Sequence, residues 1–117
     1  MSNKIMLVLV LNKIEYLDNL LIGLSEAGLP SATVLNSTGM MQQLASLDEE
    51  RIIATLRPFM TANHTENKTI FMILNESQVS TARRTIREEI GDLTEPETGI
   101  VFGLPLLFTE GIQSIEE

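Results

Sequence analysis

The sequence predicts an α+β fold: a ferredoxin-like βαββαβ sandwich with two helices on one face of an antiparallel four-stranded sheet. Three observations predict it. The segments follow the order strand, helix, strand, insertion, strand, helix, strand, with short connections that favour right-handed crossovers. The 117 residues suit a single domain, 1–117. Two segments, 5–11 and 70–74, are apolar at every position, which is typical of central strands with both faces covered.

The first strand is expected over residues 4–11 and the first helix over about 13–27. Apolar residues recur at helical spacing in the second of these segments: Ile14, Leu17, Leu21 and Leu24. At the start of the helix, Asn12 and Glu15 are spaced as in a capping box. At its end, Gly28 stands where a left-handed C-terminal cap is needed, so we expect the helix to stop there.

The second strand is expected over residues 31–38, where both faces mix polar and apolar side chains. This mixture suits an edge strand better than a central one. Residues 40–67 then form an insertion with a less regular pattern. A capping box followed by a helical repeat predicts a helix over about 47–57, and Pro58 ends or kinks it.

The second half of the chain repeats the order strand, helix, strand. We expect the third strand over 68–74 and the next helix over about 77–90, with Asn75 or Ser77 as its N-terminal cap. A fourth strand follows over about 99–108. Since the first and third strands are the fully apolar ones, they are expected in the centre of the sheet and the other two at its edges.

The two central strands raise a problem of burial. Both helices lie on one face of the predicted sheet, yet these strands are apolar on both faces. One set of side chains must face away from the helices, and the residues open to that assignment are Met6, Val8, Val10, Phe71 and Ile73. In water they would form a larger apolar patch than monomers usually tolerate, so the sequence predicts an oligomer formed through the open face. The alternative is that the insertion helix covers part of this face.

Composition excludes several kinds of function. The chain has no cysteine and one histidine, His64, which excludes thiolate chemistry and leaves little room for a histidine-built metal site or a catalytic triad. Its formal net charge of −8 argues against nucleic-acid binding. No apolar run is long enough to span a membrane, and no signal-peptide cleavage pattern follows the first strand, so we expect a cytoplasmic protein.

Several short motifs resemble those of one family. Glu-Ala-Gly-Leu over 26–29 precedes the second strand, Thr-Val over 33–34 lies near its start, and Gly39 follows it. Residues 99–106, Gly-Ile-Val-Phe-Gly-Leu-Pro-Leu, combine a loop glycine, an apolar strand and a Leu-Pro pair. Together these motifs resemble the nitrogen regulatory PII signalling family and its trimeric relatives. The resemblance covers most of the chain except 40–67, which takes the place of the family's long T-loop.

The resemblance implies a non-enzymatic homotrimer with three clefts between its subunits. These clefts would bind an adenine nucleotide (ATP, ADP or AMP), and the T-loop would report the bound state to a regulated enzyme or transporter. Carried over by position, Thr33 would contact the adenine and Gly99 would let the backbone approach the phosphates. Gly39 and Gln43 would lie at the base of the T-loop. No residue would be catalytic and none would bind a metal.

The chain departs from the family pattern at positions that would meet phosphate. Ile100 stands where the family places a lysine after the loop glycine, and residues 108–112 lack the family's arginines. The loop before the last strand carries Asp92, Glu95 and Glu97 but no cation. Because burying phosphate charge without paired cations is costly, the sequence predicts that the usual PII mode of ATP binding is disturbed.

Other interpretations stay open at this point. A structural or adaptor trimer without a ligand would agree with the missing cations. A divalent-metal-binding trimer similar to the CutA family would need clustered ligands that the sequence does not display. An acylphosphatase-type enzyme would need an arginine after the first strand, where this chain has Asn12 and Lys13. Gly99 and Gly103 could also serve only a loop exit and a strand bulge.

Overall fold

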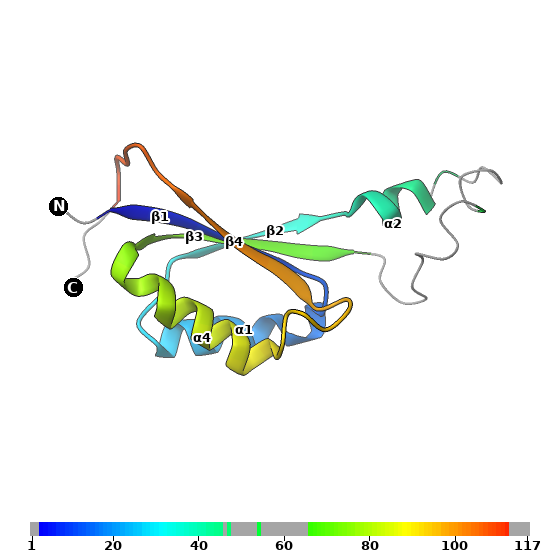
Figure 1. The fold of residues 1–117 in the computed structure, drawn as a ribbon, viewed down its shortest axis with the longest axis horizontal. Helices are drawn as coiled ribbons and strands as arrows, with labels where there is room; N and C mark the ends of the chain where they lie inside the picture. Colours follow the sequence, from blue (N-terminus) through cyan, green and yellow to red (C-terminus); the bar gives the residue numbers. More distant parts are fainter. Residues whose placement is uncertain (1–2, 46, 48–53, 55–65, 113–117) are drawn as a thin grey trace.

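A computed structural model describes residues 3–45, 47, 54 and 66–112 of the chain. Figure 1 shows one sheet with two longer helices on the same side of it. The strands are β1 (Lys4–Leu11), β2 (Ala32–Ser37), β3 (Asn67–Asn75) and β4 (Gly99–Pro105). The helices are α1 (Leu17–Glu26), α2 (Met40–Ala45) and α4 (Val79–Ile90), with short 3-10 helices η1 (Ile14–Tyr16) and η3 (Glu76–Gln78).

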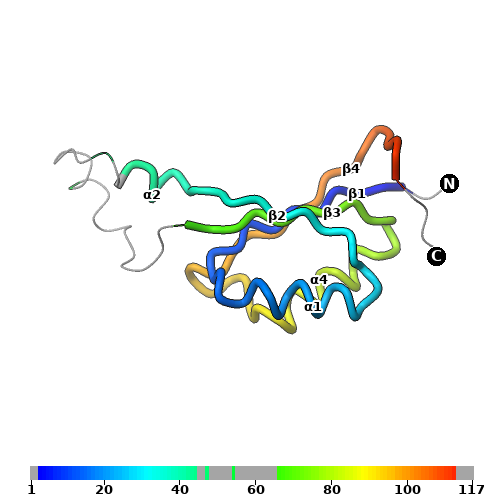
Figure 2. Tube along the Cα trace, turned by 180° about the vertical axis from the view of Figure 1, so that it is seen from behind, coloured from blue at the N-terminus to red at the C-terminus, as the bar shows by residue number. Residues whose placement is uncertain are grey.

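The sheet has the order β2-β3-β1-β4, and every neighbouring pair of strands is antiparallel. The two apolar strands, β1 and β3, are therefore central, as their composition predicts. Figures 1 and 2 show α1 and α4 packed on one face, and no helix of the described residues covers the other face. The α+β, ferredoxin-like arrangement predicted from the order of the segments is confirmed.

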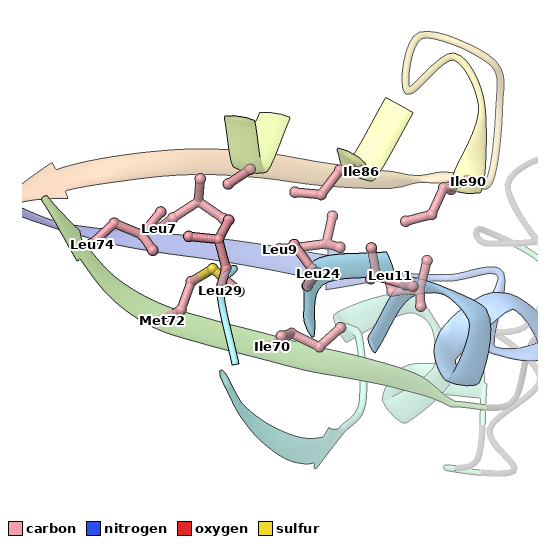
Figure 3. Close-up of a cluster of buried hydrophobic side chains, with 12 residues drawn as sticks. Leu7, Leu9, Leu11, Leu24, Leu29, Ile70, Met72, Leu74, Ile86 and Ile90 are labelled. Atoms are coloured by element: carbon pink, nitrogen blue, oxygen red, sulfur yellow. The ribbon is translucent and has the colours of Figure 1, made fainter. Parts of the chain in front are cut away.

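The core lies between the sheet and the two helices. Alternate residues of the central strands point into it because side chains of a strand alternate between the faces of the sheet. The buried cluster consists of Leu7, Leu9, Leu11, Leu20, Leu24, Leu29, Ile70, Met72, Leu74, Ala82, Ile86 and Ile90. Figure 3 shows these side chains meeting between the strands and the helices. Full burial of one large apolar side chain contributes about 1.5–3 kcal/mol, so this layer is the main source of stability.

The opposite face of the sheet is also apolar. The cross-strand pairing places Val8 between Phe71 of β3 and Phe102 of β4. The other members of this face, which we call the open face, include Met6, Val10, Ile73, Ile100 and Leu104. Ile100 is 63% exposed and Phe102 is 46% exposed, whereas Val8, which lies between the two phenylalanines, is buried.

The described part of the insertion does not cover the open face. Figures 1 and 2 both place α2 beyond the end of the sheet, roughly in line with β2. The predicted helix over 47–57 lies outside the described residues except for Leu47, which is in a turn, and Ala54, which is helical. A helix between β2 and β3 is present as expected, but this helix is α2, Met40–Ala45, which precedes the predicted range.

The capping box predicted at the start of the first helix is wrong. The chain enters a 3-10 turn at Ile14, its N-cap is Lys13 without a side-chain hydrogen bond, and α1 begins only at Leu17. The physical reason is that Asn12 still belongs to the sheet. Its N–H donates to the Thr98 carbonyl (3.1 Å), and its own carbonyl accepts from the Ile14 N–H (2.9 Å).

The end of α1 and the start of the second helical segment agree better with the sequence. Gly28 has φ +87°, and the Leu29 N–H donates to the Leu24 carbonyl (2.8 Å), as in a left-handed cap. Of the two candidate caps before α4, Asn75 forms a capping box with Gln78, whose side chain accepts from the Asn75 N–H at 2.8 Å. The chain then passes through η3 before α4 begins.

The last strand is shorter than predicted. It ends at Pro105 because its partner β1 begins at Lys4, whose carbonyl accepts from the Leu106 N–H at 3.0 Å. Beyond this bond Leu107 and Phe108 are exposed. The expected strand boundary at residue 108 is therefore wrong by three residues.

Replacement of Gly28 by alanine should lower the free energy of unfolding by about 1 kcal/mol, because only the left-handed backbone conformation opposes a Cβ there. No heavy atom lies within 4 Å of that Cβ, so no steric clash contributes. Urea denaturation at one fixed protein concentration measures the change. Gly28→Asn is the matched control and should cost less than Gly28→Ala. Equal stability of wild type and Gly28→Ala would contradict this account of the cap.

Candidate ligand site at the edges of the sheet

The four residues predicted to line a ligand site lie at the periphery of the sheet. Thr33 is an exposed residue of the edge strand β2, and Gly99 is the first residue of the other edge strand, β4. Gly39 follows the end of β2. Gln43 lies in α2, where its N–H donates to the Gly39 carbonyl (3.0 Å). The site therefore consists of strand edges and the start of the insertion.

One copy of the chain does not bring Thr33 and Gly99 together. Thr33 pairs with Phe71 of β3, and Gly99 pairs with Leu11 of β1, so β3 and β1 both separate β2 from β4. Three strand spacings correspond to about 14 Å. Any site that uses both residues needs the β2 edge of one copy and the β4 edge of another.

Gly99 has a structural reason to be glycine. Its φ is +156°, and a Cβ there would lie 2.7 Å from the Val10 carbonyl oxygen of the paired strand. Close approach of two backbones thus excludes a side chain at this position. A Cβ at Gly103 would meet the Ile5 side chain at 3.3 Å, so both glycines serve the pairing of β4 with β1.

A polar network holds β2 and β3 together at the base of the insertion. The Ser37 hydroxyl lies 2.7 Å from the Thr69 hydroxyl and donates to the side-chain oxygen of Asn67, which is buried. Beside it, the Lys68 ammonium donates to the Asn36 side-chain oxygen at 2.5 Å. Sequence reasoning missed this network. Its only signal was that two apolar strands end in polar residues at matching positions.

The loop from α4 to β4 is shaped by its own polar groups. The Thr94 backbone N–H and hydroxyl both donate to one carboxylate oxygen of Asp92, at 2.9 and 2.7 Å. These two bonds, the hydroxyl first, hold the pKa of Asp92 below its usual value of 3.8, and Arg87 acts in the same direction more weakly. Further along, Glu97 adopts φ +63°, and the hydroxyl of Thr98, which is 1% exposed, has no hydrogen-bond partner among the described residues.

The charges near the candidate residues do not fit a nucleotide polyphosphate. In the sequence no Lys or Arg occurs over 14–50 or 88–117, and these stretches contain all four candidate residues. Lys68 donates to Asn36, and the arginines of α4 lie on the helical side of the sheet. Lys13 is the remaining described cation at this end of the sheet. A triphosphate normally requires several charge-assisted hydrogen bonds, which one lysine does not supply.

Metal binding finds equally little support in the described part of the chain. No group of three or more His, Cys, Asp or Glu side chains is placed there to hold an ion. The acids of the 92–98 loop therefore do not form a recognisable set of ligands. No helix of the described residues is long and apolar enough to cross a membrane.

Comparison with known proteins gives matches only at the level of structure. No family model and no curated protein matches the sequence. Citrate-bound PII from Arabidopsis thaliana superposes with a TM-score of 0.63 at 15% identity, covering 90% of this chain and 78% of that one. The ATP complex of GlnK from B. subtilis gives 0.58 at 16% identity, with 91% and 84% covered. A protein of unknown function from Pediococcus pentosaceus gives 0.61 at 16%, with 96% and 99% covered.

The strand order and the single helical layer define the class of this protein as an α+β domain of ferredoxin-like topology. Within that class, the superpositions show that the chain has the fold of PII proteins. At 15–16% identity they show the fold alone. What the chain binds must therefore be argued from its own residues.

The carboxyl group of Asp92 should titrate below 3.8, and Thr94→Val should raise its pKa because the hydroxyl donor is lost. Since the folded pKa lies below the unfolded one, the stabilisation is present above the unfolded pKa and is lost as the pH falls through the folded value. NMR titration of the side-chain carboxyl carbon measures the shift. Thr94→Ser keeps the donor and should leave the pKa unchanged; the same pKa in Thr94→Val would refute the assigned cause.

Proposed function

We propose that this protein is a trimeric PII-like regulator that binds a small ligand between its subunits and signals to a partner protein through the insertion at 40–67. The likeness to PII and GlnK supports this proposal, and two of the solved neighbours carry small molecules, citrate and ATP. The observation that carries it is the position of Thr33 and Gly99. They lie on opposite edges of one sheet, so they meet only between copies.

The open face supplies the drive for assembly. It carries a contiguous set of large apolar side chains from β3, β1 and β4, several of them more than a third exposed. At about 25 cal/mol per Å² of apolar surface, burial of this face against other copies would strongly favour association. The helices occupy the other face, so contact through the open face leaves them on the outside of the assembly.

A trimer would both bury the open face and bring the β2 edge of one copy to the β4 edge of the next. A contact between the β2 edge of one copy and the β4 edge of the next is heterologous, and heterologous contacts close into a ring when the rotation permits. Three copies would place one such contact at each of three clefts. The resemblance of the sequence to PII proteins gives the same number.

The insertion is suited to act as the output element. It leaves the sheet beyond β2, and Figure 1 shows its described helix, α2, standing clear of the helical layer. Met40 at the start of α2 is 73% exposed, and methionine adapts readily to a binding surface. The Ser37, Asn67 and Thr69 network fixes the base of the insertion next to Gly39, so a ligand that contacts Gly39 would act directly on this base.

An adaptor trimer without a ligand is the second candidate. The absence of Lys and Arg from the two stretches that hold the candidate residues favours it. The adaptor and the regulator would form the same trimer, but only the regulator would bind a ligand in the cleft. Ligand titration therefore distinguishes the two.

Replacement of Phe102 by aspartate should convert the trimer into monomers, because it places a charge within the apolar open face. Native mass spectrometry or analytical ultracentrifugation measures the mass. Ile22→Asp is the matched control: Ile22 is similarly exposed, at 56%, but lies on α1 in the helical layer. The control should remain a trimer. A wild-type monomer, or a trimer formed by Phe102→Asp, would refute the assembly proposed above.

A cysteine pair tests whether β2 and β4 of different copies meet. The chain has no cysteine, so Thr33→Cys with Ile100→Cys introduces the only thiols. Within one copy the two strands are about 14 Å apart, beyond the reach of a disulfide. Oxidation or a short thiol cross-linker should therefore join separate chains into dimers and trimers on denaturing gels.

The cross-link has two controls. Each single cysteine variant should give no covalent trimers on the gel, since a subunit must carry two thiols to be linked to both of its neighbours. Ile22→Cys with Ile100→Cys should also give none, because α1 lies in the helical layer. Efficient trimer formation by this control, or none by the pair Thr33→Cys and Ile100→Cys, would contradict the proposed contact of the two edges.

A further inference from the structure

We infer that the ligand of the intersubunit site is an uncharged, nucleoside-sized molecule and that phosphate groups weaken its binding. This inference rests on the proposed function, because the site exists only between copies. It departs from the nucleotide that the resemblance implies. The departure follows from the charges and the side chains that the two strand edges present.

Both edges are poor in cations. The β2 side, with Gly39 and α2, comes from a stretch without Lys or Arg, and so does the β4 side with its preceding loop. That loop carries Asp92, Glu95 and Glu97, all exposed. Each phosphate placed beside them would meet like charge, which weakens its binding.

The described cations that lie nearest do not reverse this balance. Lys68 pairs across the strands with Leu11 and Asn36, in a row that faces the helices and not the open face, and its ammonium donates to the Asn36 side chain. Lys13 follows β1 at the same end of the sheet as Gly99. Even with Arg87, which acts on Asp92, the cations on this side are fewer than the three carboxylates of the loop. The net charge of −8 per chain adds to the repulsion of polyanions over longer distances.

The same edges do present apolar surface and hydroxyl groups. Leu35 of β2 and Ile100 of β4 share the open face and are both about half exposed or more. Thr33 is exposed on the same face as Leu35. Ligand sites are commonly lined by apolar side chains with a few polar groups that fix orientation. This combination suits a small molecule with an apolar face and hydrogen-bonding groups but no net negative charge.

The experiment compares adenosine, AMP, ADP and ATP, without magnesium, by isothermal titration calorimetry of the assembled protein. Affinity should fall with each added phosphate and be at least tenfold lower for ATP than for adenosine. Added salt should narrow the difference, because it screens the repulsion. Tighter binding of ATP than of adenosine would overturn the inference. Absence of binding by all four would also overturn it and favour the adaptor trimer.

A substitution at Ile100 tests the position of the missing charge. Ile100→Lys should raise the affinity for ATP about tenfold or more relative to the affinity of the same variant for adenosine. Ile100→Gln is the neutral polar control and should not raise it. An unchanged ATP affinity in Ile100→Lys would contradict the placement of this residue beside the ligand.

The mass of the assembled protein tests the proposed trimer separately from the inference about its ligand. A wild-type protein that is not a trimer refutes the proposed function, whatever it binds. A trimer that prefers ATP refutes only the inference about the ligand. Each variant is titrated after its own mass has been measured, so that loss of assembly is not mistaken for loss of binding.

Discussion

The structure depends on the burial of β1, a central strand whose side chains are apolar on both faces. Leu7, Leu9 and Leu11 point towards α1 and α4 and form the core with β3. Val8 and its neighbours point to the open face, where no described helix covers them. A strand of this kind is stable only when both of its faces leave water. The fold buries one face within the chain, and in the proposed trimer association between copies buries the other.

This constraint also determines where a site can form. In the proposed trimer the open faces of several copies meet, the free edges of their sheets approach one another, and β2 and β4 form the walls of a cleft. The glycines of β4 serve its close pairing with β1 and need no ligand to explain them. The chemistry of the cleft is then set by the few exposed side chains of the two edges. In this chain β2 and β4 present apolar and uncharged polar side chains, and the loop before β4 is acidic. These side chains do not supply the phosphate chemistry that the resemblance to PII proteins implies.

Much of the fold could be predicted from the sequence because its signals are local. Continuous apolar runs gave the central strands to within one residue, and Gly28 marked the end of α1. The failures involve contacts between distant segments. Asn12 has the composition of a helix cap, but its N–H is taken by Thr98, 86 positions along the chain by residue number. The Ser37–Asn67 contact joins the two ends of the insertion, and no local sequence pattern predicts it.

The hydrogen bonds that Ser37 forms with Asn67 and Thr69 have an evolutionary consequence. They close the sheet before the insertion begins, so the ladder between β2 and β3 does not rely on the residues that follow Gly39. Each doubling of the length of such a loop adds only about 0.6 kcal/mol of closure entropy. Descendants of this chain can therefore lengthen, shorten or rewrite the insertion at small energetic cost, and so acquire a new partner while the sheet and its edges stay the same.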